Sequence, residues 1–284
     1  MKLSDQQLER YARHIVLKEI GGAGQARLAQ AHVLLVGAGG IGCPAIQYLA
    51  AAGVGRLTVI DDDQVSLSNL QRQVLFGTDD IGRNKVDVAS EAAGRINPDI
   101  DLVAINQRLT ATSGASLLDG VDVVLDGCDN FMTRLIVNDL CYAAQVPLVS
   151  SAIGQFHGQI GTYRGWEDGK PCYRCFVGDA HDPDDCDSCS EVGVLGAMVG
   201  LMGSFAAMEA IRVITGFGDD PAGKLHIIDG LAPSMRTIRL PKDPGCSTCG
   251  ARASTGASTS STYGSHCSRR STHRWWTTGS TWPP

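Results

Sequence analysis

The sequence has 284 residues, 43% of them hydrophobic, which is enough apolar material for one large α/β domain or two small ones. The net charge of −6 hides an asymmetry: four arginines and no acidic residue follow Gly250, so residues 1–250 hold 20 basic and 30 acidic side chains. An acidic body argues against nucleic acid as the main partner. The polar start, Met1–Arg13, lacks the apolar region of a signal peptide. We therefore expect a cytoplasmic protein whose ten cysteines are thiols or metal ligands.

The chain begins with a predicted helix. Ser4 and Gln7 have the spacing of a capping box, and apolar residues follow at helical spacing as far as Ile15. Arg13 flanks this apolar stripe, a position typical of a solvated helix face. A glycine-rich loop, Gly21–Gly24, is expected to separate this helix from the first strand.

A glycine turn organises the N-terminal half. The apolar run Val33–Val36 predicts a buried parallel strand, and the turn Gly37–Gly42 fits the pattern G-x-G-x-x-G. An apolar helix, Ile41–Ala52, follows at once. Three glycines of the turn allow, in this order, the tight bend, the approach of backbone N–H groups to a phosphate, and close helix–strand packing: Gly37, Gly39 and Gly42.

A carboxylate follows the next predicted strand, Leu57–Ile60. Asp61 lies 19 residues beyond Gly42, where a dinucleotide fold places the carboxylate that binds a ribose hydroxyl. Together the turn and Asp61 predict a nucleotide at the N-terminus of a helix.

Cations downstream of this turn indicate which nucleotide is bound. Arg72 lies in the polar run Ser68–Gln73, and Lys85 follows. A nicotinamide cofactor has only a diphosphate to hold, whereas a nucleoside triphosphate undergoing cleavage builds charge on the departing phosphates. The pattern therefore favours ATP over NAD.

A second acidic segment follows a later strand. After Lys85, helical spacing from Val86 to Ile96 predicts a helix that stops before Pro98, and strands are predicted at Asp101–Ile105 and Val121–Leu125. The last of these strands ends in Asp126–Asn130, at the edge where open α/β sheets bind ligands. Asp129 is therefore a candidate Mg²⁺ ligand, or else the N-cap of the helix that begins near Asn130.

Beyond a predicted helix at Asn130–Ala144, the pattern changes from alternating strands and helices to strands in succession. An apolar, glycine-rich segment, Val192–Met208, is predicted as a buried helix, being too short to span a bilayer convincingly. The later strands are predicted at Pro147–Val149, Gln159–Tyr163, Lys224–Asp229 and Thr237–Leu240. The expected fold is a Rossmann-like doubly wound α/β sheet, parallel at first and continuing into a mixed or antiparallel half. Residues 1–250 would form one domain, and the Ser/Thr-rich tail 251–284 is expected to be disordered.

Three C-x-x-C pairs compete for one metal site: Cys172/Cys175, Cys186/Cys189 and Cys246/Cys249. Two pairs make an S₄ site suited to structural Zn²⁺. Proximity favours the first two pairs, whereas the surrounding Pro/Gly-rich turns favour the first and third. Cys189 would then precede the glycine-rich helix, where a thiol has a lowered pKa.

Taken together, these motifs resemble the ThiF/MoeB/HesA family, bacterial relatives of ubiquitin-activating enzymes, over about residues 4–250. The resemblance implies ATP-dependent adenylation of the C-terminal Gly-Gly carboxylate of a ubiquitin-like sulfur carrier, for thiamine or molybdopterin sulfur transfer. It also implies a homodimer, in which Arg13 reaches the neighbouring subunit's ATP. The sulfur donor would be a separate protein.

The resemblance assigns roles to individual residues. It implies that Gly40 and Asp61 bind the nucleotide. It implies that Asn69, Arg72 and Lys85 bind the phosphates, with Ser68 in the same polar run. It gives Mg²⁺ to Asp129, with Asn130 beside it. It gives zinc to four thiols: Cys172, Cys175, Cys246 and Cys249. In some members the residue that matches Cys189 joins the carrier's activated C-terminus.

Three other functions were weighed against this one. An NAD-dependent oxidoreductase would use the turn and Asp61 but gives no task to Arg72, Lys85 or Asp129. An ATP-dependent dehydratase acting on a tRNA base should have a basic surface, which the acidic body contradicts. A non-catalytic scaffold would not need these four side chains.

Overall fold

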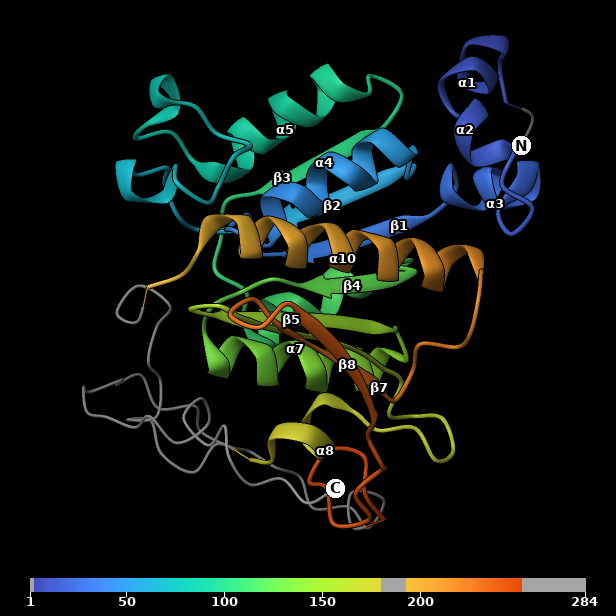
Figure 1. Cartoon of the computed structure of the whole chain (residues 1–284), viewed down its shortest axis with the longest axis vertical. Coiled ribbons are helices and arrows are strands. Elements are labelled where there is room, and N and C mark those ends of the chain that lie inside the picture. The colour runs from blue at the N-terminus through green and yellow to red at the C-terminus, as the bar shows by residue number, and fades with distance from the viewer. Residues whose placement is uncertain (1–2, 180–192, 252–284) are drawn as a thin grey trace.

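The computed structural model describes residues 3–179 and 193–251 (Figure 1). The predictions for Cys186, Cys189 and the tail beyond Ala251 lie outside the described residues.

One eight-stranded sheet forms the centre of the fold, in the order β3-β2-β1-β4-β5-β6-β7-β8. The first five strands in this order run parallel, and β6, β7 and β8 add to them antiparallel. This confirms the predicted change from a parallel to an antiparallel half. The strands are β1 His32–Val36, β2 Arg56–Ile60, β3 Asp101–Ile105, β4 Val123–Asp126, β5 Leu148–Gly154, β6 His157–Tyr163, β7 Lys224–Asp229 and β8 Ser234–Arg239.

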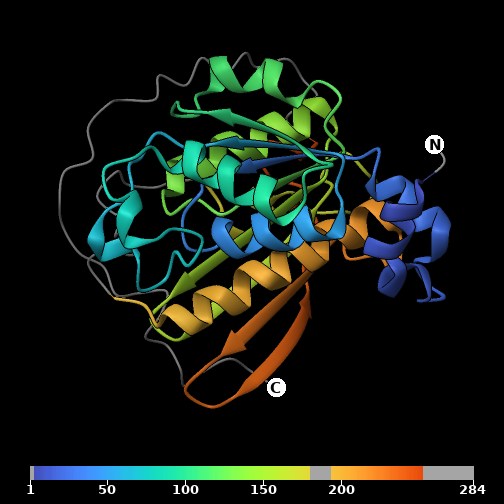
Figure 2. The same ribbon diagram turned by 90° about the horizontal axis from the view of Figure 1, so that it is seen from above.

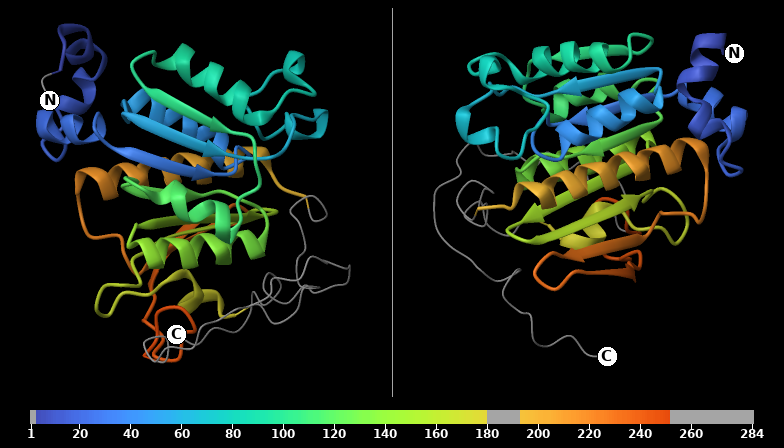
Figure 3. Two further views of the ribbon diagram at one scale, coloured as in Figure 1. Left: turned by 180° about the vertical axis from the view of Figure 1, so that it is seen from behind. Right: turned by 45° about the horizontal axis from the view of Figure 1, so that its top comes forward.

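Helices cover both faces of the sheet, as Figure 1 and the rear view in Figure 3 show. α4, α5 and α10 pack on one face, and α7 packs on the other against β4 and β5. The α-helices are α1 Asp5–Arg10, α2 Ala12–Ile15, α3 Gly21–Leu28, α4 Gly42–Ala52, α5 Lys85–Ile96, α6 Ala111–Ala115, α7 Phe131–Ala144, α8 Tyr173–Val177 and α10 Gly196–Thr215. Short 3₁₀ turns are η1 Leu67–Asn69, η2 Thr78–Asp80 and η3 Ser116–Leu118.

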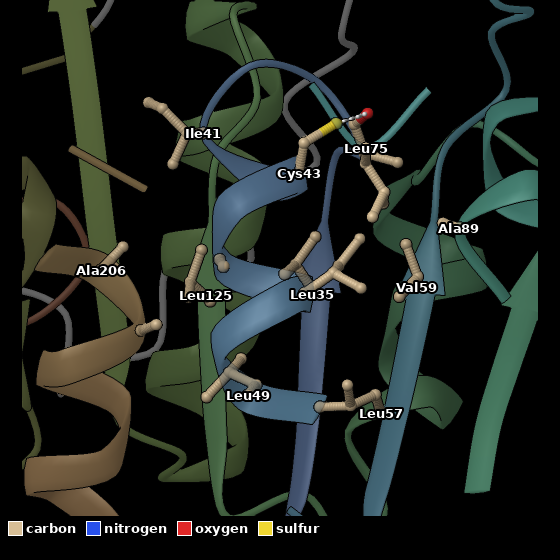
Figure 4. Close-up of a cluster of buried hydrophobic side chains, with 14 of the residues drawn as sticks. Leu35, Ile41, Cys43, Leu49, Leu57, Val59, Leu75, Ala89, Leu125 and Ala206 are labelled. Carbon is tan, nitrogen blue, oxygen red and sulfur yellow. Dashed lines mark hydrogen bonds between the residues drawn. The ribbon is translucent and has the colours of Figure 1, made fainter. Parts of the chain in front are cut away.

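The central strand β1 is apolar from Val33 to Val36 because both its faces are buried there. Leu35 belongs to the core beneath α4 and α10, whereas Leu34 and Val36 belong to the core beneath α7. Figure 4 shows the first of these cores, where Leu35 lies among side chains from neighbouring strands and helices such as Leu49 and Leu57. This alternation explains why the continuous apolar run predicts a strand of a parallel sheet.

The N-terminal helix is divided in two. The capping box of Ser4 and Gln7 starts α1 as predicted, but the helix is interrupted at Tyr11. The Tyr11 side chain is 4% exposed, and its hydroxyl accepts a hydrogen bond from Asn97 Nδ2 at 2.8 Å. Figure 2 shows the pair α1–α2 projecting from the end of the sheet. The buried tyrosine fastens this projection to the body.

The predicted loop Gly21–Gly24 is wrong, because these residues open helix α3. Gln25 and Leu28 of this helix are fully buried, and Gln25 Nε2 donates to the carbonyl of Ala52 at 2.8 Å. A Cβ at Gly24 would come within 2.8 Å of Ile20, so the absence of a side chain allows this close packing. Tertiary burial thus outweighs the poor helix propensity of glycine.

Helix α10 has the length and hydropathy of a membrane span, with 44% of its apolar window buried. It packs along α4, β5 and β6, so we interpret it as a core helix of the α/β domain. This agrees with the predicted burial of its segment, although the helix begins later and ends later than predicted, at Gly196 and Thr215.

Candidate active site

The carboxyl ends of β1, β2 and β4 lie side by side at one edge of the sheet, since β1 pairs in parallel with both neighbours. The chain leaves β1 towards one side and reaches β4 on the other, so β1 and β4 flank the point where strand order reverses. In open α/β sheets ligands bind at such a switch point.

The glycine turn occupies this point and depends on its missing side chains. Gly37 has φ +94, a conformation that favours glycine. A Cβ at Gly42 would overlap the carbonyl oxygen of Gly37 and lie 3.1 Å from its carbonyl carbon. The turn is therefore closed tightly against the start of α4, as the motif predicts.

Two other loops contact the turn. A Cβ at Gly37 would lie 3.3 Å from the carbonyl oxygen of Gly127, and one at Gly40 would lie 3.6 Å from Arg72 Cγ. Arg72 is half-buried, and its Nη1 donates to the carbonyl of Ser68 at 3.0 Å. The predicted phosphate-binding loop and the loop after β4 thus both lie against the glycine turn.

Asp61 connects the end of β2 to the turn. Its Oδ2 accepts the Ala38 N–H at 2.7 Å, and its Oδ1 accepts the Asp63 N–H at 2.8 Å. Burial raises the pKa of Asp61 above its usual value, and the nearby Lys85 ammonium opposes that rise. The carboxylate is thus fixed in place by backbone donors, next to a cation.

Lys85 is the first residue of α5 and is only 4% exposed. Its Nζ lies 2.7 Å from Asp63 Oδ2. A lysine this deeply buried requires an anionic partner. The structure therefore places Lys85 Nζ against Asp63 and near Asp61, at the same edge as the glycine turn.

The remaining residues of the polar run have different environments. Ser68 is exposed, and Asn69, half-buried, accepts the backbone N–H groups of Arg72 and Gln73 at 3.0 and 2.9 Å with its carbonyl. The Gln73 side chain is 3% exposed, and its Oε1 is buried with no hydrogen-bond partner among the described residues. The 3₁₀ turn η1 therefore sets the direction of Arg72.

The structure of the loop after β4 distinguishes between the two roles considered for Asp129, a Mg²⁺ ligand or a helix N-cap. Asn130, not Asp129, is the N-cap of α7, and its Oδ1 accepts the Thr133 N–H at 3.0 Å. Asp129 is exposed and makes no hydrogen bond or ion pair with any described residue. The capping alternative is therefore wrong for Asp129, and its carboxylate is available to a ligand at the edge.

A buried ion pair beneath this loop was not predicted. Asp126 ends β4 and is fully buried, and its Oδ2 lies 3.2 Å from Arg134 Nη1. The Arg134 guanidinium also donates to Ser150 Oγ at 3.2 Å, to the carbonyl of Ser151 at 2.9 Å and to the carbonyl of Cys128. The pair thus fixes the loop that carries Asp129 to the ends of β4 and β5.

Arg13 does not join this site within its own chain. It is exposed on α2, two residues after Tyr11, which bonds Asn97 just past the end of α5. Lys85 starts α5, and a helix of this length spans about 18 Å. Figure 1 shows the N-terminal helices and the loops before α5 at opposite sides of the molecule. Arg13 therefore lies at the other edge of the sheet.

Four cysteines form a separate cluster: Cys172, Cys175, Cys246 and Cys249. Their sulfur atoms lie within 4.8 Å of one another, with Cys172–Cys246 at 3.5 Å and Cys175–Cys249 at 3.3 Å. Ligands of a tetrahedral Zn–S₄ centre with bonds of about 2.3 Å lie about 3.8 Å apart, so the donor set fits zinc. The hydrogen bond with the Cys172 thiol lowers the pKa of Cys175 below its usual value. The pairing favoured by the surrounding turns is the one that the structure brings together.

The chain is similar in sequence to several known proteins. The model of the ThiF family matches residues 11–248. A SAMP-activating enzyme E1 of Haloferax volcanii is 42% identical over 250 residues, covering 88% of this chain and 92% of the relative. The molybdopterin-synthase adenylyltransferase of Escherichia coli is 43% identical, covering 88% and 99%. The sulfur carrier protein ThiS adenylyltransferase of the same organism is 43% identical, covering 87% and 97%.

Solved structures share the fold. The crystal structure of E. coli MccB with ATP superposes with a TM-score of 0.73 and 25% identity, covering 85% of this chain and 74% of that one. The complex of MccB with MccA-N7isoASN gives a TM-score of 0.74 at 23% identity, with the same coverage. Since the family model and the relatives span most of the sequence, the chain belongs to the ThiF family.

Proposed function

We propose that this chain adenylates the C-terminal Gly-Gly carboxylate of a ubiquitin-like sulfur carrier with ATP and releases pyrophosphate. The observation that carries the proposal is the convergence of Arg72, of Asp61 with the nearby Lys85, and of the loop of Asp129 on one glycine turn. The relatives named above include adenylyltransferases of molybdopterin synthase and of ThiS, but no oxidoreductase and no tRNA dehydratase. We assign the activity to a single domain, residues 1–250.

In this proposal the protein positions charges and leaves the bond-making to the substrates. Asp61 and Gly40 hold the nucleoside, while Asn69, Arg72 and Lys85 bind the phosphates. The carrier's carboxylate attacks the α-phosphate, which needs no general base because a carboxylate is already nucleophilic at neutral pH. Arg72 and Lys85 stabilise the charge that builds on the departing pyrophosphate.

Magnesium fits the loop after β4. Asp129 offers an exposed carboxylate without a partner among the described side chains, and oxygen donors suit Mg²⁺. When bound, the metal would neutralise phosphate charge, and Asn130 beside it caps α7 and so fixes the position of this loop.

Zinc would have a structural role. The cysteine cluster joins α8 to the segment after β8, away from the glycine turn. Four thiolates leave the metal no open position for a substrate. Cys189, outside the described residues, is the remaining candidate for a covalent link to the carrier, and the separate sulfur donor and the cytoplasmic location stay predictions.

A homodimer would complete the site with Arg13 of a second copy, because this residue cannot reach the site of its own chain. Leu201 and Met208 lie seven residues apart on one face of α10 and are 48% and 41% exposed, which supplies apolar surface for such contact. Mixing Arg13→Ala with Arg72→Ala tests this. Random exchange of subunits should restore roughly one quarter of wild-type activity, since half of the dimers have one complete site. No recovery after verified exchange would exclude a shared site.

The reaction itself is tested by incubating the protein with ATP and ThiS- or MoaD-like carriers, then weighing each carrier for an added AMP. Carrier-dependent exchange of pyrophosphate into ATP gives the rate. Arg72→Ala and Lys85→Ala should each lower this rate about 10²–10³-fold, as expected for the loss of a transition-state donor. Arg83→Ala is the matched control, because Arg83 pairs with Asp80 and Glu91 at the surface. Undiminished exchange in the two site variants would refute the assignment.

A further inference from the structure

Asp63 is the anion that pairs with Lys85. Its Oδ2 lies 2.7 Å from Lys85 Nζ, although the Asp63 side chain is 62% exposed and that of Lys85 only 5%. The backbone of Asp63 is fixed as well, because its carbonyl accepts the Lys85 N–H at 3.0 Å. The Lys85 side chain is thus buried, whereas the carboxylate of its partner Asp63 faces solvent.

The Lys85 ammonium is paired with Asp63 and is near a second carboxylate, Asp61, and the two carboxylates differ in their freedom to move. Asp61 accepts two backbone N–H groups, one from Ala38 and one from Asp63 itself, so it cannot turn away. The Asp63 carboxylate bonds Lys85 and no other described side chain. Since rotation about its side-chain bonds would release it to water, Asp63 is the partner that can leave.

We propose that Asp63 is a positioning residue that holds Lys85 in place until the triphosphate displaces it. This inference rests on the proposed function, since it supposes that ATP phosphates bind Lys85. A buried ammonium is costly unless it is fully paired, so Asp63 serves, beside the fixed Asp61, as a resident counter-ion of Lys85 until a phosphate replaces it. The same counter-ion competes with the triphosphate and weakens the binding of ATP.

The test compares Asp63→Asn with Asp62→Asn in the full-length protein. Asparagine keeps an oxygen that accepts from Lys85 but removes the charge. ATP should bind the Asp63→Asn protein up to about fivefold more tightly in calorimetry without carrier, the value of a pair at the surface. The KM for ATP in the exchange assay should fall by the same factor with kcat unchanged, as for uniform binding. Asp62 pairs with Arg108 at 3.1 Å, and its variant should match wild type.

Two further variants separate this role from general effects. In a Lys85→Met background, Asp63→Asn should no longer change ATP affinity, because the carboxylate acts through Lys85. Asp63→Ser removes the charge by another route and should also tighten binding, which covers a poorly folded asparagine variant. Unchanged or weaker ATP binding by both Asp63 variants would refute the inference, whereas failure of wild type to bind ATP would refute the proposed function instead.

Discussion

Replacing Gly42 with alanine should damage the glycine turn without removing any charge. The added Cβ would overlap the carbonyl oxygen of Gly37 and lie 3.2 Å from Leu35 Cδ2, so it would meet backbone on one side and the buried core on the other. Forced packing of this kind costs about 1–3 kcal/mol of stability. At about 2–4 °C per kcal/mol, Tm should fall by about 2–12 °C. A displaced turn should also raise the Kd for ATP at least about tenfold, because misplaced groups lose binding geometry.

Gly94 provides the matched control for this prediction. It lies within α5, is exposed, and an added Cβ would meet no atom within 4 Å. Gly94→Ala should therefore stabilise the helix by up to about 1 kcal/mol and leave ATP affinity unchanged. Thermal unfolding and calorimetric titration with ATP measure both quantities. Wild-type Tm and ATP affinity in Gly42→Ala would show that the close approach to Gly37 does not constrain the turn.

Three more predictions follow from the buried charges and the thiols. Arg134→Met leaves the fully buried Asp126 carboxylate without its cation and should lower the free energy of unfolding, measured in urea, by about 3–5 kcal/mol. Adding Asp126→Asn should recover part of this loss. A double variant whose loss of stability equals the sum of the two single losses would contradict the pairing. Cys246→Ser should abolish binding of one zinc per chain and lower Tm, whereas Cys43→Ser should retain zinc in metal analysis. Burial raises the pKa of Asp61, so on acidification its carboxylate should protonate at a higher pH than an exposed aspartate, whose pKa is about 4. ATP affinity should fall over the same pH range in which Asp61 protonates. Asp61→Asn should bind ATP more weakly with no such dependence, and a pH profile shared by both proteins would refute that origin.

The strands and the glycine turn could be predicted because their causes are local. The run Val33–Val36 is apolar at every position, which fits burial on both faces, and the helix predicted after Lys85 and before Pro98 is α5, Lys85–Ile96. The error at Gly21–Gly24 has a tertiary cause: Arg27 in the same helix donates to the carbonyl of Thr215 at the far end of α10. No pattern within residues 21–28 predicts a contact with a residue as distant in the sequence as Thr215.

The Asp126–Arg134 pair shows what sequence reasoning missed and how it could have been found. A carboxylate that ends an apolar strand has to be paired if the strand is buried. The helix Phe131–Ala144 contains one basic residue, Arg134, so the candidate partner was already determined. The position of Arg13 could not be obtained in this way, because it depends on how α2 packs beside the end of α5.

Strand β8 is the edge strand of the antiparallel half of the described sheet. All six of its residues are exposed, and it is bonded to β7 alone in the described sheet. Unpaired peptide groups along such a border can recruit a further strand from another molecule and so start aggregation. Arg236 and Arg239 place two positive charges there, and an approaching copy of the same strand would bring the same charges against them. Replacing both arginines with valine should therefore reduce solubility before it changes catalysis.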